Sequence, residues 1–265
     1  KMEKDQNARK YLQFVFTDNN KLMGFGFGYP FFIYPKVSAS SSSTQRSVQE
    51  KYRVLDSLIT KNYLSDSIKA FTGCILAVQG EEIVYKNCNG FLDRSGKIPL
   101  NDSSRFLLAS CSKQFTAFAI MLLQEKGKLN VHDPVKNHLP NFPYDSISIE
   151  NLLTHSSGIP DYMKLLKKHW DRNRMATNQD ILQLLIEHQP KCYFKANKSF
   201  DYSNTAYVLL SLIIEKSSGM SYAEFMQKNI FEPLGMHQSI VYARRKEKAV
   251  ENYALGYVYS KETKQ

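Results

Sequence analysis

Residues 107–125 read LLASCSKQFTAFAIMLLQE. From Cys111 onward, apolar side chains recur with the period of an α-helix that has a buried face. Gly127 follows, and glycine commonly ends a helix because it readily adopts a left-handed backbone. We therefore predict a strongly apolar helix over residues 111–125 that Gly127 closes.

A change of hydrophobic period separates this helix from the residues before it. The segments GCILAV at 73–78 and EEIVYKNCNGF at 81–91 are short, apolar and β-branched, so they predict a β-hairpin around Gly80. Helical spacing is found at 46–64, 148–154, 177–188, 204–217 and 221–230. A β start followed by a helix-rich middle indicates an α+β fold, with a helical lobe inserted into a sheet domain.

We expect four parts along the chain. Residues 1–45 form an N-terminal extension that ends in the serine run Ser38–Ser43, which is typical of a linker. Residues 46–106 form the first portion of the sheet domain, and residues 107–240 form the helical lobe that carries the functional motifs. Residues 241–265 begin the return to the sheet domain.

The chain of 265 residues carries a formal net charge of +10 and has a pI of about 9.3. Its basic residues cluster at 164–174 and 244–248, but other residues interrupt both clusters and no nucleic-acid-binding motif accompanies them. We expect a solvated basic surface and no nucleic-acid partner, although an acidic surface such as a cell envelope would attract it. No apolar run of about 18 residues occurs, so no membrane-spanning helix is predicted.

The 4 cysteines form no CxxC pair and have no histidine at zinc-finger spacing. Cys74 and Cys88 fall in the two strands of the predicted hairpin, where a disulfide is conceivable. We nevertheless expect reduced thiols, which leaves the redox compartment open. No constellation of metal ligands is found, so neither a metal nor another cofactor is predicted.

An S-x-x-K motif, Ser110–Lys113, opens the apolar helix. Positions i and i+3 share a helix face, so the Lys113 amine is expected to reach the Ser110 hydroxyl. A serine becomes a nucleophile when a base takes its proton. A lysine partly buried by Phe115 and Phe118 could supply a neutral amine for this task. The alternative is a helix-start serine followed by a surface lysine.

A second motif is Tyr202-Ser203-Asn204. In an extended segment, residues i and i+2 point the same way, so the Tyr202 phenol and the Asn204 carboxamide would project together before the next helix. A phenol can relay a proton, and a carboxamide can bind a substrate carbonyl and tether the lysine. The alternative is an ordinary loop in which Asn204 caps the helix.

Four blocks occur in order: LLASCSKQFTAFAIMLLQEKGKLNVHDPV at 107–135, IENLLTHSSGIPDY at 149–162, FDYSNTAYVLLSLIIEKSSGMSYAEFM at 200–226 and IFEPLGMHQS at 230–239. In these blocks the chain resembles the serine β-lactamase and penicillin-binding family. It is most similar to the class C-related branch, which also includes D-alanyl peptidases, D-aminopeptidases and esterases. The resemblance spans residues 72–258. It implies a largely antiparallel sheet flanked by helices, with an all-helical lobe beside it and the active site between them.

The resemblance implies a role for each motif residue. Ser110 matches the acylated nucleophile and Lys113 its activating partner. Tyr202 matches the general base that later returns a proton to the leaving group, and Asn204 matches the residue that orients the substrate and the lysine. The Lys113–Tyr202 pair is expected to accept the serine proton, and neither residue is chosen over the other. The backbone N–H of Ser110 is expected to form half of the oxyanion hole.

The chain departs from the family pattern at two places. Ala196-Asn197 stands where the family usually has Pro-Gly, and asparagine tolerates the left-handed backbone of such a turn. The third family motif, a Lys- or His-containing triad ending in glycine on a late strand, has no match after the second motif. Lys216–Gly219 is interpreted as a helix end with a glycine C-cap. Because the chain stops at Gln265, we expect it to lack the C-terminal strands, and the hairpin at 73–91 to expose an edge through which chains could associate.

Four further features are expected to be structural. His155 should pack and hydrogen-bond a loop, and Asp161-Tyr162 should shape the rim of the cleft. Trp170 should pack against the protein and not stack on a ligand. Glu232 should belong to a turn.

The resemblance implies a serine hydrolase that forms an acyl-enzyme on Ser110 and acts on a β-lactam, a D-alanyl peptide or an ester. The expected partner is therefore a small molecule or a peptidoglycan-like peptide, and a periplasmic or secreted location is favoured. The competing hypothesis is a non-hydrolytic binding protein of the same fold, inactive because the third motif is missing.

Overall fold

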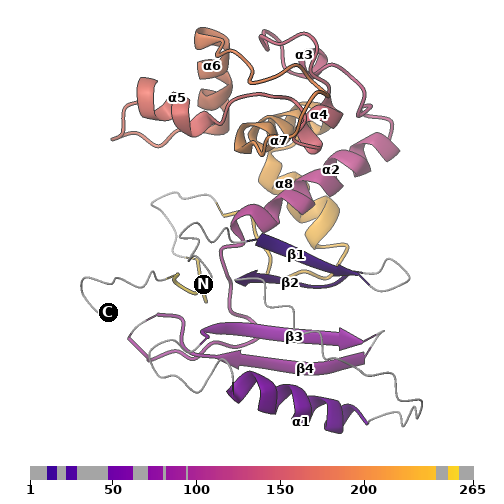
Figure 1. The fold of residues 1–265 in the computed structure, drawn as a ribbon, viewed down its shortest axis with the longest axis vertical. Helices are drawn as coiled ribbons and strands as arrows, with labels where there is room; N and C mark the ends of the chain where they lie inside the picture. The colour runs from indigo at the N-terminus through magenta and orange to yellow at the C-terminus, as the bar shows by residue number, and fades with distance from the viewer. Residues whose placement is uncertain are drawn as a thin grey trace, which may run out of the picture. The chain divides into compact units, whose positions relative to one another are not determined.

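The computed structural model of the chain describes residues 11–16, 22–28, 47–61, 71–79, 82–93, 95–242 and 250–256. The chain divides into two compact units (Figure 1). One comprises Lys1–Leu107 and Lys246–Gln265, and the other comprises Leu108–Arg245. Both helices and antiparallel strands are present, which confirms the predicted α+β class.

Among its described residues, the first unit contains two antiparallel strand pairs and one helix. β3 (Gly73–Gln79) pairs with β4 (Glu82–Asn89), as the sequence predicted, and α1 spans Val48–Ile59 within the predicted helix 46–64. β1 (Tyr11–Phe16) pairs with β2 (Leu22–Gly28), and this pair was not predicted. The glycines that alternate in LMGFGFG disfavour a strand, so that segment was assigned to the extension. The serine run at 38–43 lies outside the described residues.

A buried tyrosine joins α1 to β4. The Tyr85 side chain is fully buried, and its hydroxyl donates a hydrogen bond to Asp56 Oδ1 at 3.1 Å. Its ring lies 4.9 Å from that of Tyr52. Burial, and then the hydrogen bond to Asp56, raise the pKa of the Tyr85 phenol above its usual value.

The hairpin of β3 and β4 is closed by a disulfide. Cys74 lies directly opposite Cys88 in the register, and the two residues form a disulfide across a Cα–Cα distance of 4.0 Å. The expectation of reduced thiols is therefore wrong for this pair, because the register faces the two sulfurs toward each other. Cys111 and Cys192 are free, and burial raises the pKa of both thiols.

Residues 250–256 close the first unit from a distant part of the chain. The Arg105 N–H donates to the Asn252 carbonyl at 2.7 Å, and the Ala254 N–H donates to the Arg105 carbonyl at 2.8 Å. The Leu255 N–H donates in turn to the Leu92 carbonyl at 2.8 Å. These backbone bonds attach the segment to the stretch that follows the hairpin.

The second unit is helical and contains every predicted site residue. Its helices are α2 (Lys113–Glu125), α3 (Val135–His138), α4 (Ile149–Leu153), α5 (Tyr162–His169), α6 (Asn178–His188), α7 (Asn204–Ser218) and α8 (Tyr222–Met226), followed by a π-helical turn at Gln227–Phe231. The predicted helices over 111–125, 148–154, 177–188, 204–217 and 221–230 are confirmed within two residues at their starts. α3 and α5 were not predicted.

The core of this unit is built around α7. This helix buries its residues on more than one face, and α2, α4 and α6 pack against it. Fully buried side chains of α7 include Leu209, Leu210, Ile213 and Ile214. Gly219 ends the helix with φ 72° and donates its N–H to the Glu215 carbonyl at 2.9 Å. The interpretation of Lys216–Gly219 as a helix end is confirmed.

Two loops that flank the predicted motifs are joined by backbone hydrogen bonds. The Tyr193 N–H donates to the Gly158 carbonyl at 2.9 Å, and the Asp201 N–H donates to the His155 carbonyl at 3.0 Å. Gly158 has φ +72°, and a Cβ atom there would lie 2.3 Å from the Phe194 carbonyl oxygen. Only glycine allows this close approach of the two backbones.

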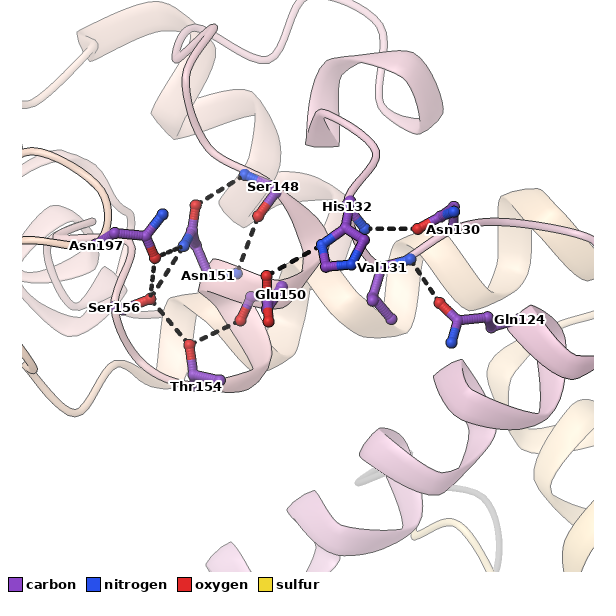
Figure 2. Close-up of polar contacts among 10 residues, drawn as sticks. All are labelled: Gln124, Asn130, Val131, His132, Ser148, Glu150, Asn151, Thr154, Ser156 and Asn197. Carbon is purple, nitrogen blue, oxygen red and sulfur yellow. Dashed lines mark hydrogen bonds and ion pairs between the residues drawn. The ribbon is translucent and has the colours of Figure 1, made fainter.

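A polar network anchors the same two loops to α4 (Figure 2). Asn151 is buried, and its Nδ2 donates to Ser156 Oγ at 3.0 Å and to Asn197 Oδ1 at 2.6 Å. Its Oδ1 accepts from the Ser148 N–H at 3.1 Å in a capping box. Asn197 has φ 64°, so the expectation that asparagine adopts the left-handed turn is confirmed. Its side chain also accepts a hydrogen bond that glycine could not accept.

His155 organises the chain just before α7, as expected of a structural residue. Its Nδ1 accepts a hydrogen bond from the Ser203 N–H at 3.1 Å. Its ring lies 4.6 Å from the Tyr202 ring and 5.2 Å from the Tyr207 ring. Burial, and then the positive charge of Lys113, lower the pKa of His155 below its usual value, so the neutral ring accepts this bond.

We expect Gly158→Ala to destabilise the protein far more than Gly219→Ala. Both glycines have φ +72°, so both substitutions incur the left-handed penalty of about 1–2 kcal/mol. An added Cβ at Gly219 meets nothing within 4 Å, whereas at Gly158 it meets the Phe194 carbonyl. Urea unfolding of both variants measures the difference, and equal losses in the free energy of unfolding would contradict the close approach.

The lowered pKa of His155 predicts a pH-dependent stability. An unfolded histidine takes up a proton below pH about 6.5, whereas folded His155 stays neutral there. The unfolded state then binds more protons, so the free energy of unfolding falls as the pH drops below about 6.5. In His155→Asn, the asparagine still offers a hydrogen-bond acceptor and tolerates the left-handed backbone, but it does not titrate. The free energy of unfolding should therefore fall less as the pH drops.

Urea unfolding between pH about 7 and 5 tests the expectation. His132→Asn is the matched control, because that histidine has a side chain exposed to 72%. The expectation would be contradicted if the slope of the free energy of unfolding against pH were unchanged in His155→Asn, or if it changed equally in both variants.

Candidate active site

Ser110 lies on a tight turn at the entry to α2. A 3-10 turn over Ala109–Ser112 precedes the helix, and the Cys111 N–H donates to the Leu108 carbonyl at 3.0 Å. Ala109 has φ 47°, a left-handed conformation that is unfavourable for alanine. Such strained backbone is concentrated at functional sites.

Two side chains converge on the Ser110 hydroxyl. Lys113 Nζ lies 3.2 Å from Ser110 Oγ, as the i, i+3 spacing predicted. The Tyr202 hydroxyl lies 2.6 Å from the same oxygen, although it is 92 residues away in sequence. An amine and a phenol are therefore both within reach of one serine proton.

Lys113 is enclosed differently from the sequence expectation. Its Nζ lies 4.9 Å from the centre of the Tyr202 ring and 5.5 Å from that of Tyr207. Phe118, which was expected to cover it, is 50% exposed. The aromatic faces beside the amine thus come from the second motif and α7.

The second motif projects its two functional side chains as predicted. Ser203 has φ −126° and ψ 119°, so the backbone is extended and Tyr202 and Asn204 lie on the same side. Asn204 Oδ1 accepts from Lys113 Nζ at 2.9 Å. The alternative with Asn204 as the helix cap is wrong, because Ser203 caps α7 by accepting from the Ala206 N–H at 3.3 Å.

Asp161 makes a contact that the sequence did not indicate. It was expected to shape a rim, but its Oδ2 accepts from Asn204 Nδ2 at 2.8 Å and from the Asn204 N–H at 3.2 Å. Its Oδ1 caps α5 by accepting from the Met163 N–H at 2.9 Å. An aspartate just before a helix is a recognisable cap signal, but its contact with Asn204 is a long-range one.

The remaining candidates have structural surroundings. Trp170 packs against the core and donates its Nε1–H to the Arg174 carbonyl at 2.7 Å. Glu232 accepts from Gln227 Nε2 at 3.2 Å in the turn after α8. The Cys111 thiol is buried, and burial raises its pKa, so it is poorly suited to act as a nucleophile.

The described residues show neither a metal-binding cluster nor a membrane-spanning helix. Among them, no group of three or more His, Cys, Asp or Glu side chains is arranged to hold a metal ion. Within the same part of the chain, no helix combines the length and apolar character needed to cross a membrane.

Comparisons with known proteins give a consistent result. The family model described as beta-lactamase matches residues 64–259. The chain is 47% identical over 190 residues to penicillin-binding protein 4* of Bacillus subtilis, covering 71% of this chain and 42% of the relative. It is 33% identical over 199 residues to the putative penicillin-binding protein PbpX of the same organism, covering 73% of this chain and 47% of the relative. The chain thus spans less than half of these relatives.

Solved structures show the same similarity. A penicillin-binding protein from Bacillus halodurans aligns with a TM-score of 0.66 and 33% identity, covering 78% of this chain and 61% of that chain. A D-amino acid amidase from Ochrobactrum anthropi aligns with a TM-score of 0.59 and 28% identity, covering 71% of this chain and 52% of that chain. Since the family model extends over most of the sequence and a relative shares nearly half of the aligned residues, the chain belongs to the beta-lactamase family of serine hydrolases.

Proposed function

We propose that Ser110 is the nucleophile of a serine hydrolase that forms an acyl-enzyme. The observation that carries the proposal is the convergence of the Tyr202 hydroxyl, at 2.6 Å, and Lys113 Nζ, at 3.2 Å, on Ser110 Oγ. A serine hydroxyl needs a neighbouring base before it attacks a carbonyl, and both groups can serve as that base.

The reaction follows from these contacts. Ser110 Oγ bonds to the carbonyl carbon of the substrate, and its proton passes to the Lys113–Tyr202 pair. When the bond to the leaving group breaks, the pair returns the proton to the departing nitrogen or oxygen. Water then attacks the carbonyl carbon of the ester on Ser110 and gives one proton to the pair. As the bond from that carbon to Ser110 Oγ breaks, the pair passes the proton to Ser110 Oγ, which releases the acid and restores the free serine. Asn204, bound to Lys113 at 2.9 Å, keeps the amine in place during this cycle.

The proposed substrates are a β-lactam, a D-alanyl peptide or a simple ester. The names of the relatives support this set, since they are penicillin-binding proteins, and a solved neighbour is a D-amino acid amidase. The Cys74–Cys88 disulfide supports a periplasmic or secreted location, because such bonds persist in oxidising compartments. The partner of this site would then be a cell-wall peptide or a small molecule that mimics one.

We expect Ser110→Ala to abolish covalent labelling. The intact mass of the chain should rise by one penicilloyl group after incubation with a fluorescent penicillin, or by one phosphonyl group after incubation with a fluorophosphonate, and Ser110→Ala should remove either rise. Substituting a serine at a helix start costs only about 0.5–2 kcal/mol, so the variant should fold. Labelling of folded Ser110→Ala would contradict the nucleophile. A folded wild type that takes up neither label would favour the non-hydrolytic binding protein.

Lys113→Arg and Tyr202→Phe should each slow acylation by at least about 100-fold, the low end of a general base's contribution. Arginine keeps the charge but cannot accept the serine proton, and phenylalanine lacks the hydroxyl. Tyr193→Phe is the matched control, because Tyr193 is 49% exposed and Tyr202 is 45% exposed. Rates of label incorporation measure the effect, and an equal, small loss in all three variants would contradict the assignment.

A further inference from the structure

The side chain of Asn204 lies between a cation and an anion. Its Oδ1 accepts from Lys113 Nζ at 2.9 Å, and its Nδ2 donates to Asp161 Oδ2 at 2.8 Å. A lysine ammonium group is only a donor, and an ionised carboxylate is only an acceptor. The carboxamide therefore has one favourable orientation, because turning it over would face donor to donor and acceptor to acceptor.

The position of Asp161 is itself fixed by two helix starts. Its Oδ1 accepts from the Met163 N–H at 2.9 Å as the N-cap of α5, and its Oδ2 accepts from the Asn204 N–H at 3.2 Å in the first turn of α7. Hydrogen bonds from N–H groups to a carboxylate are charge-assisted and strong. The carboxylate is thus held rigidly by the backbone before it contacts the amide.

We propose that Asp161 is a positioning residue that fixes the amide of Asn204, so that its oxygen faces Lys113 and holds the amine against Ser110 Oγ. The proposal rests on the proposed function for its kinetic effect, but its structural part, the orientation of Asn204, stands apart from it. The hydrogen-bonded order is Asp161, Asn204, Lys113 and Ser110, all within one unit of the chain.

Two substitutions separate this role from helix capping. Serine is as good an N-cap as aspartate, so Asp161→Ser should still cap α5 but cannot also reach the Asn204 amide. Asp161→Asn presents a donor where Asn204 Nδ2 donates now, which should turn the amide over and face its nitrogen to Lys113. Displacing a catalytic group by about 1 Å can cost 10²-fold in rate, so we expect a loss of that order for Asp161→Asn.

A double-mutant cycle with Asn204→Ala tests whether Asp161 acts through the amide. If it does, Asp161→Ser in the Asn204→Ala background should change the acylation rate of Ser110 by no more than about twofold, the scatter of independent sites. Asp180→Asn is the matched control, because Asp180 Oδ2 accepts from the Thr177 N–H at 2.8 Å at the start of α6. It should affect stability alone. If Asp161→Ser slows acylation as much in the Asn204→Ala background as it does in the wild type, the proposal is overturned.

An NMR readout distinguishes failure of this proposal from failure of the proposed function. The side-chain NH₂ signal of Asn204, identified by its loss in Asn204→Ala, should shift and exchange faster with water in Asp161→Ser but not in Asp180→Asn. An unchanged signal would overturn the proposal even where acylation is normal. If Asp161→Ser shifts the signal as expected but the wild type takes up no label, the hydrolase function is refuted and the orientation of Asn204 stands.

Discussion

The contact on which the site depends is the hydrogen bond from Lys113 Nζ to Asn204 Oδ1, at 2.9 Å and across 91 residues of sequence. It joins the starts of α2 and α7, which are also the two helices that pack together in the core. Burial of apolar side chains along both helices fixes their separation. Polar groups at their ends can therefore meet at hydrogen-bond distance without a separate cost for bringing the chain segments together.

Several residues around this contact adopt left-handed backbone. Ala109 precedes the serine, and His155, Gly158 and Asn197 hold the loops that lead into the second motif. His155 and Asn197 are fixed by specific contacts, namely the bond from the Ser203 N–H to His155 and that from Asn151 to Asn197. Residues in such conformations persist where the surrounding structure determines them. The loops at the site are thus rigid supports, which is what an accurately placed hydroxyl requires.

The motifs that could be predicted from sequence are those whose geometry is local. The spacing from Ser110 to Lys113 follows from one helical turn, and the alternation of Tyr202 and Asn204 follows from one extended residue. The contacts that were missed are long-range: Asp161 with Asn204, and the tyrosine rings beside Lys113. No local pattern encodes them.

The first strand pair and the disulfide were missed for a related reason. The glycine-rich β2 looks like a loop when its propensity alone is considered, and its pairing with β1 overrides that propensity. The disulfide was misjudged because it depends on strand register, which places Cys74 opposite Cys88. A shift of one residue would have sent the two sulfurs to opposite faces.

The geometry also separates the reaction from the choice of substrate. Lys113 and Tyr202 contact the Ser110 oxygen, while Asn204 and Asp161 act behind the lysine. In the proposed reaction these groups serve the attacked carbonyl and its leaving atom, which β-lactams, peptides and esters all possess. The same machinery can therefore accompany different substrates, as the similarity to both a penicillin-binding protein and a D-amino acid amidase suggests. Selection among them must then come from side chains that contact the rest of the substrate and not from this hydrogen-bonded group.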